Sequence, residues 1–104
     1  MEPLYEIPNE LKRLRASIDN CDAALVHILA ERFRCTDAVS FLKADHHMPA
    51  SDFKREKEQI VRWRCLAEES GLNPDLAEVF LKLLIQYATR HHEEVAAQAV
   101  IRNS

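Results

Sequence analysis

Apolar side chains recur at intervals of three or four residues through the first half of the chain. This spacing keeps the series on one face of an α-helix and forms a seam typical of long packed helix pairs. No Gly or Pro occurs between Pro8 and Pro49, so we expect one helix over residues 9–45, with Asn9 at its N-cap. The seam positions are Leu11, Leu14, Ile18, Cys21, Leu25, Ile28, Arg32, Cys35, Val39 and Leu42.

Helix breakers predict a second helix after the first. Pro49 belongs to a short connector, because proline disfavours helical geometry in the residue before it. Ser51 or Asp52 then supplies an N-cap. The second helix covers residues 52–70 and stops at Gly71, the usual type of C-terminal glycine.

Asn73 and Pro74 open a third helix over residues 74–102, as an N-cap followed by proline at the first helical position. The chain has one glycine in total, which excludes sandwiches, barrels and Gly-rich phosphate loops because their tight turns need glycine. A length of 104 residues is enough for one domain. We therefore predict a single all-α domain over residues 1–104.

The first predicted helix is too long for a compact monomer. At about 1.5 Å per residue it would span about 55 Å. A globule of this size has a radius of gyration of about 13 Å, and an uncovered apolar seam would forfeit hydrophobic stabilisation. Either the helix breaks or another chain covers it, and we favour a homodimer in which this helix packs on its partner.

Composition and charge narrow the possible partners. The formal net charge is −3, which gives no reason to expect nucleic acid. No apolar run approaches the roughly 18 residues of a membrane span, and the acidic N-terminus does not resemble a signal peptide. Three cysteines, an odd number, indicate reduced thiols in a cytoplasmic protein. The histidine pairs at 46–47 and 91–92 have no recognised ligand spacing to the cysteines, so we expect no metal.

One charged residue, Arg32, interrupts the apolar seam. Its stem could pack while its guanidinium reaches solvent, or an anion could hold the guanidinium inside the bundle. No acidic residue shares the seam, so the counter-charge would come from another helix or from a ligand. Arg15 lies about 25 Å away along the helix and could serve such a site only across an antiparallel dimer. Taken alone, Lys43 and Arg55 are ordinary surface charges.

Several short motifs, at matching spacing, give the chain a family resemblance. They are LRxxIDxxD at residues 14–22, the pair Glu31-Arg32, Lys43, DFKRE at residues 52–56 and GLNP at residues 71–74. Together they resemble the all-helical (AroQ-type) chorismate mutases. The resemblance implies an intertwined homodimeric helical bundle of three-helix chains. It also implies conversion of chorismate, a dianion, to prephenate by a pericyclic rearrangement that uses no cofactor.

The resemblance also implies roles for individual residues. Arg15 matches the arginine that reaches into the partner chain's site, and Arg32 matches the arginine that holds the substrate carboxylates from its own chain. Lys43 matches the lysine that contacts a carboxylate and the ether oxygen. Asp52 and Glu56 match the positions that bind the ring hydroxyl. The remaining matches are Arg55, a neighbouring cation, and the apolar wall of Val39, Leu84 and Ala88.

The third helix departs from the family pattern. With Phe80 as anchor, the family's glutamine donor to the ether oxygen falls at His91, and a position often occupied by serine falls at Tyr87. A neutral histidine could still donate a hydrogen bond, and a charged one would donate more strongly. Alternatively, His91 is a surface residue beside His92, or Arg90 takes the role if the register differs by one.

Other functions stay open on the same scaffold. An isochorismate–pyruvate lyase is compatible with Tyr87, and a 4-amino-4-deoxychorismate mutase would share the fold, whereas Glu56 suits the ring hydroxyl of chorismate. A non-catalytic helical dimer, serving as an interaction module on a larger enzyme, would share the helicity but would not need the charged set. A partner enzyme that activates the chain is also compatible with the sequence. Trp63, at helical spacing from Ile60 and Ala67, is most simply core packing.

Overall fold

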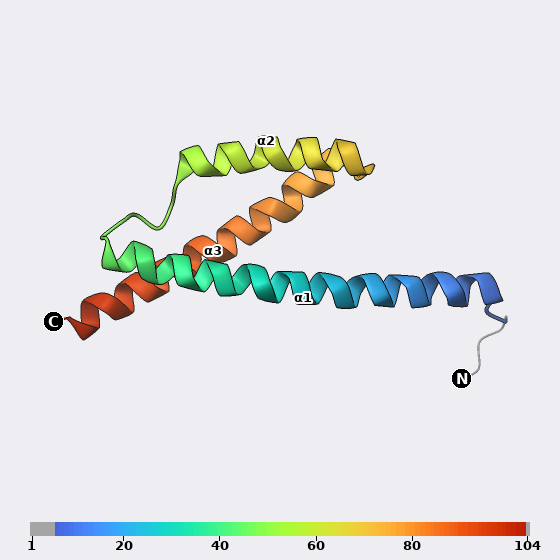
Figure 1. The fold of residues 1–104 in the computed structure, drawn as a ribbon, viewed down its shortest axis with the longest axis horizontal. Helices are drawn as coiled ribbons and strands as arrows, with labels where there is room; N and C mark the ends of the chain where they lie inside the picture. The colour runs from blue at the N-terminus through green and yellow to red at the C-terminus, as the bar shows by residue number, and fades with distance from the viewer. Residues whose placement is uncertain (1–5, 104) are drawn as a thin grey trace. The chain divides into compact units, whose positions relative to one another are not determined.

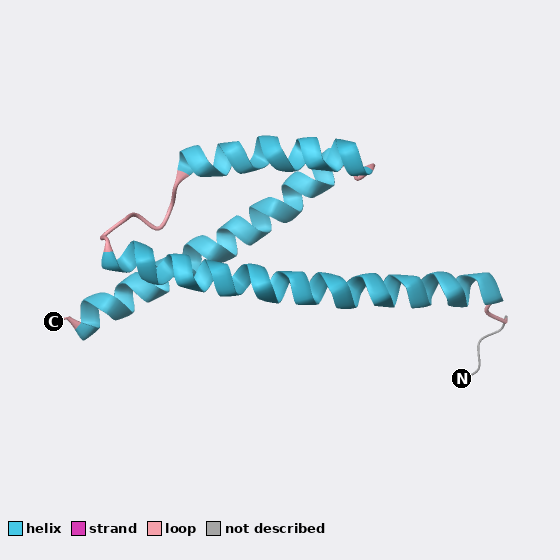
Figure 2. Cartoon of the chain, viewed as in Figure 1, coloured by secondary structure: helices cyan, strands magenta, loops and turns pink. Residues whose placement is uncertain are grey.

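The computed structural model describes residues 6–103, which form three helices and no strand (Figures 1 and 2). The helices are α1 (Asn9–Asp45), α2 (Phe53–Ser70) and α3 (Pro74–Arg102). The all-α prediction is confirmed, and the observed ends match the predicted ones except that α2 begins one residue later. None of the described helices is both long enough and apolar enough to cross a membrane.

The start of α2 shows why it differs by one residue. Asp52 has φ of −134° and lies outside the helix, and its Oδ1 accepts a hydrogen bond from the backbone N–H of Arg55 at 3.1 Å. This bond satisfies one of the amide groups that a helix leaves free at its N-terminus. Asp52 is therefore the N-cap, one of the two candidates that the sequence offered.

The turn between α2 and α3 also follows the sequence. Gly71 has φ of 79°, a left-handed conformation that glycine adopts without a side-chain penalty. The backbone N–H of Leu72 donates to the carbonyl oxygen of Ala67 at 2.8 Å, which closes the last turn of α2. Asn73 then accepts from the N–H of Asp75 at 2.9 Å and caps α3, with Pro74 in its first turn.

The chain divides into two compact units, residues 1–34 and 35–104, and each is considered by itself. In the second unit, α2 and α3 lie side by side and share an apolar core (Figure 1). Trp63, which is half-buried, packs against α3, with its ring centroid 6.2 Å from that of Phe80. The buried apolar residues are Ala67, Ala77, Leu81, Leu84 and Val95.

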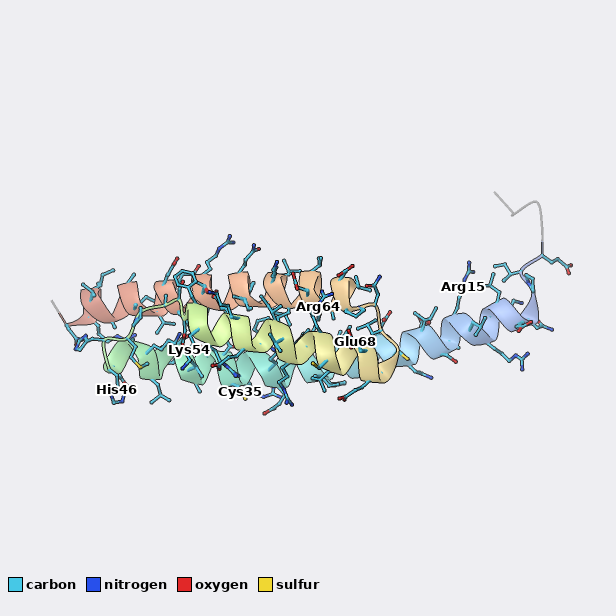
Figure 3. All side chains as sticks on the ribbon, turned by 90° about the horizontal axis from the view of Figure 1, so that it is seen from above. Arg15, Cys35, His46, Lys54, Arg64 and Glu68 are labelled. Atoms are coloured by element: carbon cyan, nitrogen blue, oxygen red, sulfur yellow. The ribbon has the colours of Figure 1, made fainter. Side chains whose placement is uncertain are left out.

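Ion pairs join the same two helices near their connecting turn. Arg64, labelled in Figure 3, places Nη1 3.0 Å from Asp75 Oδ1 and 3.3 Å from Glu78 Oε1. Lys82 Nζ lies 2.9 Å from the other carboxylate oxygen of Glu78. The hydrogen bond from Lys82, with the charge of Arg64, lowers the pKa of Glu78. These pairs favour one register between α2 and α3 but are largely exposed, so they add little to stability.

The apolar seam of α1 is largely uncovered. In the first unit the exposed fractions of Leu14, Ile18 and Ile28 are 56%, 57% and 64%. In the second unit, Val39 and Leu42 are also exposed. Each of these side chains would lose contact with water if another helix packed on the seam.

Candidate active site

Three predicted site residues lie at the start of α2. Asp52 caps the helix, Arg55 follows as an exposed cation, and Glu56 occupies the first turn and is half-buried. The backbone N–H of Glu56 donates to the carbonyl oxygen of Asp52 at 3.0 Å, so the two residues lie one helical turn apart. The sequence places two carboxylates and one guanidinium within the first helical turn.

Glu56 also lines an open groove of about 670 Å³ between α2 and α3. Two acidic residues, Glu56 and Glu93, and two basic residues, Lys82 and Arg90, line the groove. The apolar and uncharged part consists of Ile60, Ile85, Gln86 and Thr89. The face of α3 that lines the groove therefore carries Arg90, whereas His91 and Tyr87 do not line it.

His91 lies instead against the C-terminal part of α1. Its Nε2 is 2.7 Å from Oδ1 of Asp37, and the two side chains are 33% and 55% exposed. A carboxylate can only accept hydrogen bonds, so Nε2 carries the proton in this contact. The remaining ring nitrogen, Nδ1, is an acceptor in the neutral ring and a donor only in the charged ring.

A second polar contact joins α1 and α3 beside the first. Ser40 Oγ is hydrogen bonded to Nδ1 of His92, and Oγ also lies 3.0 Å from the carbonyl oxygen of Thr36. The hydroxyl has one proton, and donating it to Thr36 lets Oγ accept from Nδ1–H of His92. Ser40 is fully buried and His92 nearly so, and these hydrogen bonds satisfy the hydroxyl group and Nδ1 away from water.

The environment of His92 keeps its ring neutral. Burial lowers the pKa of His92, and the positive charges of Lys43 and of a protonated His91 lower it further. Desolvation disfavours the charged form of an imidazole, and a nearby like charge adds to that effect. His92 is therefore a structural partner of Ser40, while the neighbouring His91 is the more exposed ring.

Lys43 lies on the same last turns of α1. Its Nζ donates a hydrogen bond of 3.2 Å to the carbonyl oxygen of Ala50, in the connector to α2. An ammonium group has three donors, so this bond orients the side chain without using its full capacity. The side chain is half-buried, and its charge is felt at His92. Lys43, His91 and His92 thus belong to one polar cluster.

The other predicted wall and binding positions differ in exposure. Leu84 is buried in the core, Ala88 is half-buried, and Val39 is 41% exposed. Tyr87 is 60% exposed. Within the second unit, His91 therefore lies against the C-terminal end of α1, which also carries Lys43. Glu56 and Arg90 line the same groove.

The two predicted arginines of α1 lie in the first unit. Arg15 is exposed and projects from the helix (Figure 3), whereas Arg32 is half-buried. The adjacent Glu31 is engaged by Arg34, whose Nη2 lies 2.6 Å from Oε2 of Glu31. Glu31 thus has its own ion-pair partner one helical turn away.

Sequence reasoning missed Asp37 and Ser40 in the α1–α3 contact, and it did not predict the structural role of His92 there. The available signal was weak, because Asp37 and Ser40 are polar residues three apart next to an apolar seam, a common arrangement on any exposed helix face. Among residues 6–103 no group of three His, Cys, Asp or Glu side chains lies close enough to hold a metal ion.

Comparisons with known proteins agree with the resemblance seen in the motifs. The family model for chorismate mutase type II matches residues 14–93. The T-protein of Enterobacter agglomerans is 34% identical to the chain over 77 residues, which is 74% of this chain and 21% of the T-protein. The chain therefore spans about a fifth of the length of that relative.

Proposed function

Since the chain belongs to the chorismate mutase type II family, we propose that it catalyses the rearrangement of chorismate to prephenate. The observation that carries the proposal is the family match over residues 14–93, a range that contains Arg15, Arg32 and Lys43. A non-catalytic helical module has no need of three cations on one long helix whose seam is otherwise apolar.

The chemistry of this reaction explains the residue types. The rearrangement breaks a C–O bond and forms a C–C bond within one molecule, so it requires no nucleophile. The protein must hold the flexible ether side chain over the ring, which is an orientation task. It must also stabilise negative charge that develops on the ether oxygen, and fixed cationic donors do this in a site that excludes water. Arginine binds carboxylates with two parallel hydrogen bonds, and lysine supplies a compact charge.

Each helix carries predicted site residues at a spacing that places them in one row along its surface. On α1, Arg32, Val39 and Lys43 are separated by seven and four residues, which keeps them on one face. A second row on α3 consists of Leu84, Ala88 and His91, separated by four and three residues. Asp52 and Glu56 form the corresponding row on α2. In the proposed site these rows surround the substrate, with Arg55 and Tyr87 at its margin.

A second copy of the chain would complete this site. The seam steps along α1 alternate between three and four residues and read the same in both directions. Two antiparallel copies can therefore align seam on seam, with Leu25 facing Ile28 of the partner subunit and Leu14 facing Val39 of the partner subunit. Arg15 then comes level with the stretch between Arg32 and Lys43 of the partner subunit. The proposed homodimer covers the exposed seam and supplies one arginine to each site.

Purified protein incubated with chorismate tests the proposal, with product identified and with isochorismate and 4-amino-4-deoxychorismate assayed in parallel. We expect prephenate, and we expect Arg32→Ala to reduce kcat/KM by about a thousandfold, as for the loss of a strong charge-stabilising donor. Arg34→Ala is the matched control, because it removes an exposed arginine two residues away that pairs with Glu31.

Three results would separate the alternatives. Equal activity of Arg32→Ala and Arg34→Ala would remove Arg32 from the site. Turnover of isochorismate alone would indicate the lyase, for which Tyr87 is suited. A folded dimer that converts none of the three substrates would indicate the interaction module. Sedimentation of each variant checks that the change in rate does not come from loss of the dimer.

A further inference from the structure

The contact between Asp37 and His91 adds a residue to the proposed site. We propose that Asp37 positions His91: its carboxylate holds Nε2–H, and the charged ring then presents Nδ1–H to the ether oxygen of chorismate. This inference rests on the proposed function and on the 2.7 Å contact between Asp37 Oδ1 and His91 Nε2. Asp37 acts through His91 and does not itself touch the substrate.

The proton count on the imidazole carries the argument. With Nε2–H donated to the carboxylate, a neutral His91 has only a lone pair at Nδ1, which repels an ether oxygen that is gaining negative charge. The charged ring donates at both nitrogens at once. The carboxylate of Asp37 accepts from Nε2–H, and this contact fixes the orientation of the ring.

The charges around His91 are compatible with this arrangement. Besides Asp37, α1 brings Lys43 to the same cluster, and α3 contributes His92, Arg90 and Glu94 as sequence neighbours. On α2, Glu56 shares a groove with Arg90, and His91 does not line that groove. Among the described residues, Asp37 is the carboxylate hydrogen bonded to His91.

The substrate supplies a further reason for the pair. Chorismate carries two carboxylates, and an uncompensated Asp37 next to it would repel it at short range in a site that excludes water. A charged His91 cancels that carboxylate and leaves a directed N–H toward the substrate. The pair is therefore neutral as a unit, whereas Arg32 and Lys43 supply the net positive charge.

A purely structural role for Asp37 predicts something different. The same junction between α1 and α3 is already joined by the buried bond between Ser40 and His92. Asp37 is 55% exposed, so its replacement by the isosteric asparagine leaves the helix contact in place. Loss of a purely structural contact would alter stability alone, whereas loss of a positioning residue lowers kcat/KM only while His91 is present.

The test compares four proteins: the wild type, Asp37→Asn, His91→Gln and the double variant. We expect kcat/KM of the wild type to decrease as the pH rises, because the neutral ring has lost the Nδ1 proton. His91→Gln carries an amide donor at every pH, so its kcat/KM should be constant within about twofold from about pH 5.5 to 8.5. Asp37→Asn should lower kcat/KM about tenfold, because the carboxylate no longer holds the ring at Nε2.

The double variant shows whether Asp37 acts through His91 or affects the reaction directly. In the His91→Gln background, Asp37→Asn should change kcat/KM by less than about twofold, since the pair no longer exists. Asp45→Asn, which removes a carboxylate from the end of the same helix, is the matched control for a general charge effect. An equal loss from Asp37→Asn in both backgrounds would overturn the inference.

A measurement without substrate keeps the inference separate from the proposed function. The ¹⁵N chemical shifts of the His91 ring report which nitrogen carries the proton, with the resonances assigned through His91→Gln. We expect the neutral ring to be protonated at Nε2 in the wild type and to exchange between both forms in Asp37→Asn. Failure of the proposed function would appear as no prephenate from the wild type at any pH. Failure of the inference would leave the wild type active and the ¹⁵N shifts unchanged by Asp37→Asn.

Discussion

The contact between α2 and α3 and the contact between α1 and α3 are built from different forces. Trp63, Phe80 and Leu81 join α2 and α3 by apolar packing, with ion pairs only at the edge. Ser40 and His92 join α1 to α3 by a buried hydrogen bond. Apolar packing is roughly proportional to buried area and insensitive to pH. A buried polar contact depends on direction and on protonation, so chemistry is more easily tuned there.

The largest expected effect comes from the apolar contact. Leu81 is fully buried, so Leu81→Ala should lower the free energy of unfolding by about 2–5 kcal/mol through lost transfer energy and a residual cavity. Urea denaturation at a fixed protein concentration measures the change, since a dimer's stability depends on concentration. Val100→Ala, at a residue 70% exposed on the same helix, is the control and should cost far less. Similar losses for both variants would contradict the assignment of the core to α2 and α3.

A smaller loss should follow when the polar contact is broken. Ser40→Ala leaves Nδ1–H of His92 buried without an acceptor, which should cost about 1–3 kcal/mol. The control is Ser17→Ala, an exposed serine on the same helix that should change little. We expect thermal unfolding to show the loss in Ser40→Ala at pH 7.5. A neutral result would mean that another acceptor or a water molecule replaces Oγ, and that the contact is not selective for serine.

The two contacts also differ in how well the sequence predicts them. The bounds of α2 and α3 follow from Gly71, Asn73 and Pro74, because each acts on its own neighbours in the chain. The spacing of Trp63 from Ala67 identifies the face of α2 that packs. Local rules of this kind require no knowledge of where another helix lies.

The polar contact is not predictable in the same way. Pairing Asp37 with His91 and Ser40 with His92 requires the register between α1 and α3, and periodicity fixes a face but not a register. The groove gave a similar result, because Glu56 shares it with Arg90 and not with His91. The sequence suggested His91 by counting from Phe80 along a family pattern from which this helix departs, and its role as a donor stays a prediction. The roles of Arg15 and Arg32 stay predictions, and that of Arg15 also depends on a second chain.

The smallest expected effect is a pH dependence confined to the polar contact. Burial lowers the pKa of His92 in the folded chain below the ordinary value of 6.5, so the unfolded chain binds more protons as the pH falls below that value. The contribution of His92 to stability is therefore full above pH 6.5 and is lost as the pH falls toward the lowered pKa. We expect the free energy of unfolding to decrease between pH 7.5 and pH 5 in the wild type. The decrease should be smaller in His92→Gln, which cannot take up a proton.

His27→Gln is the control for the difference in pH dependence between His92→Gln and the wild type. His27 is exposed on α1, so its replacement should leave the pH dependence of unfolding unchanged. An identical pH dependence in His92→Gln and the wild type would mean that the buried bond does not oppose protonation. The α1–α3 and α2–α3 contacts would then differ only in the apolar area that each buries. A reduced dependence in His92→Gln, together with an unaltered pH dependence in Leu81→Ala, would assign the acid sensitivity to the α1–α3 contact.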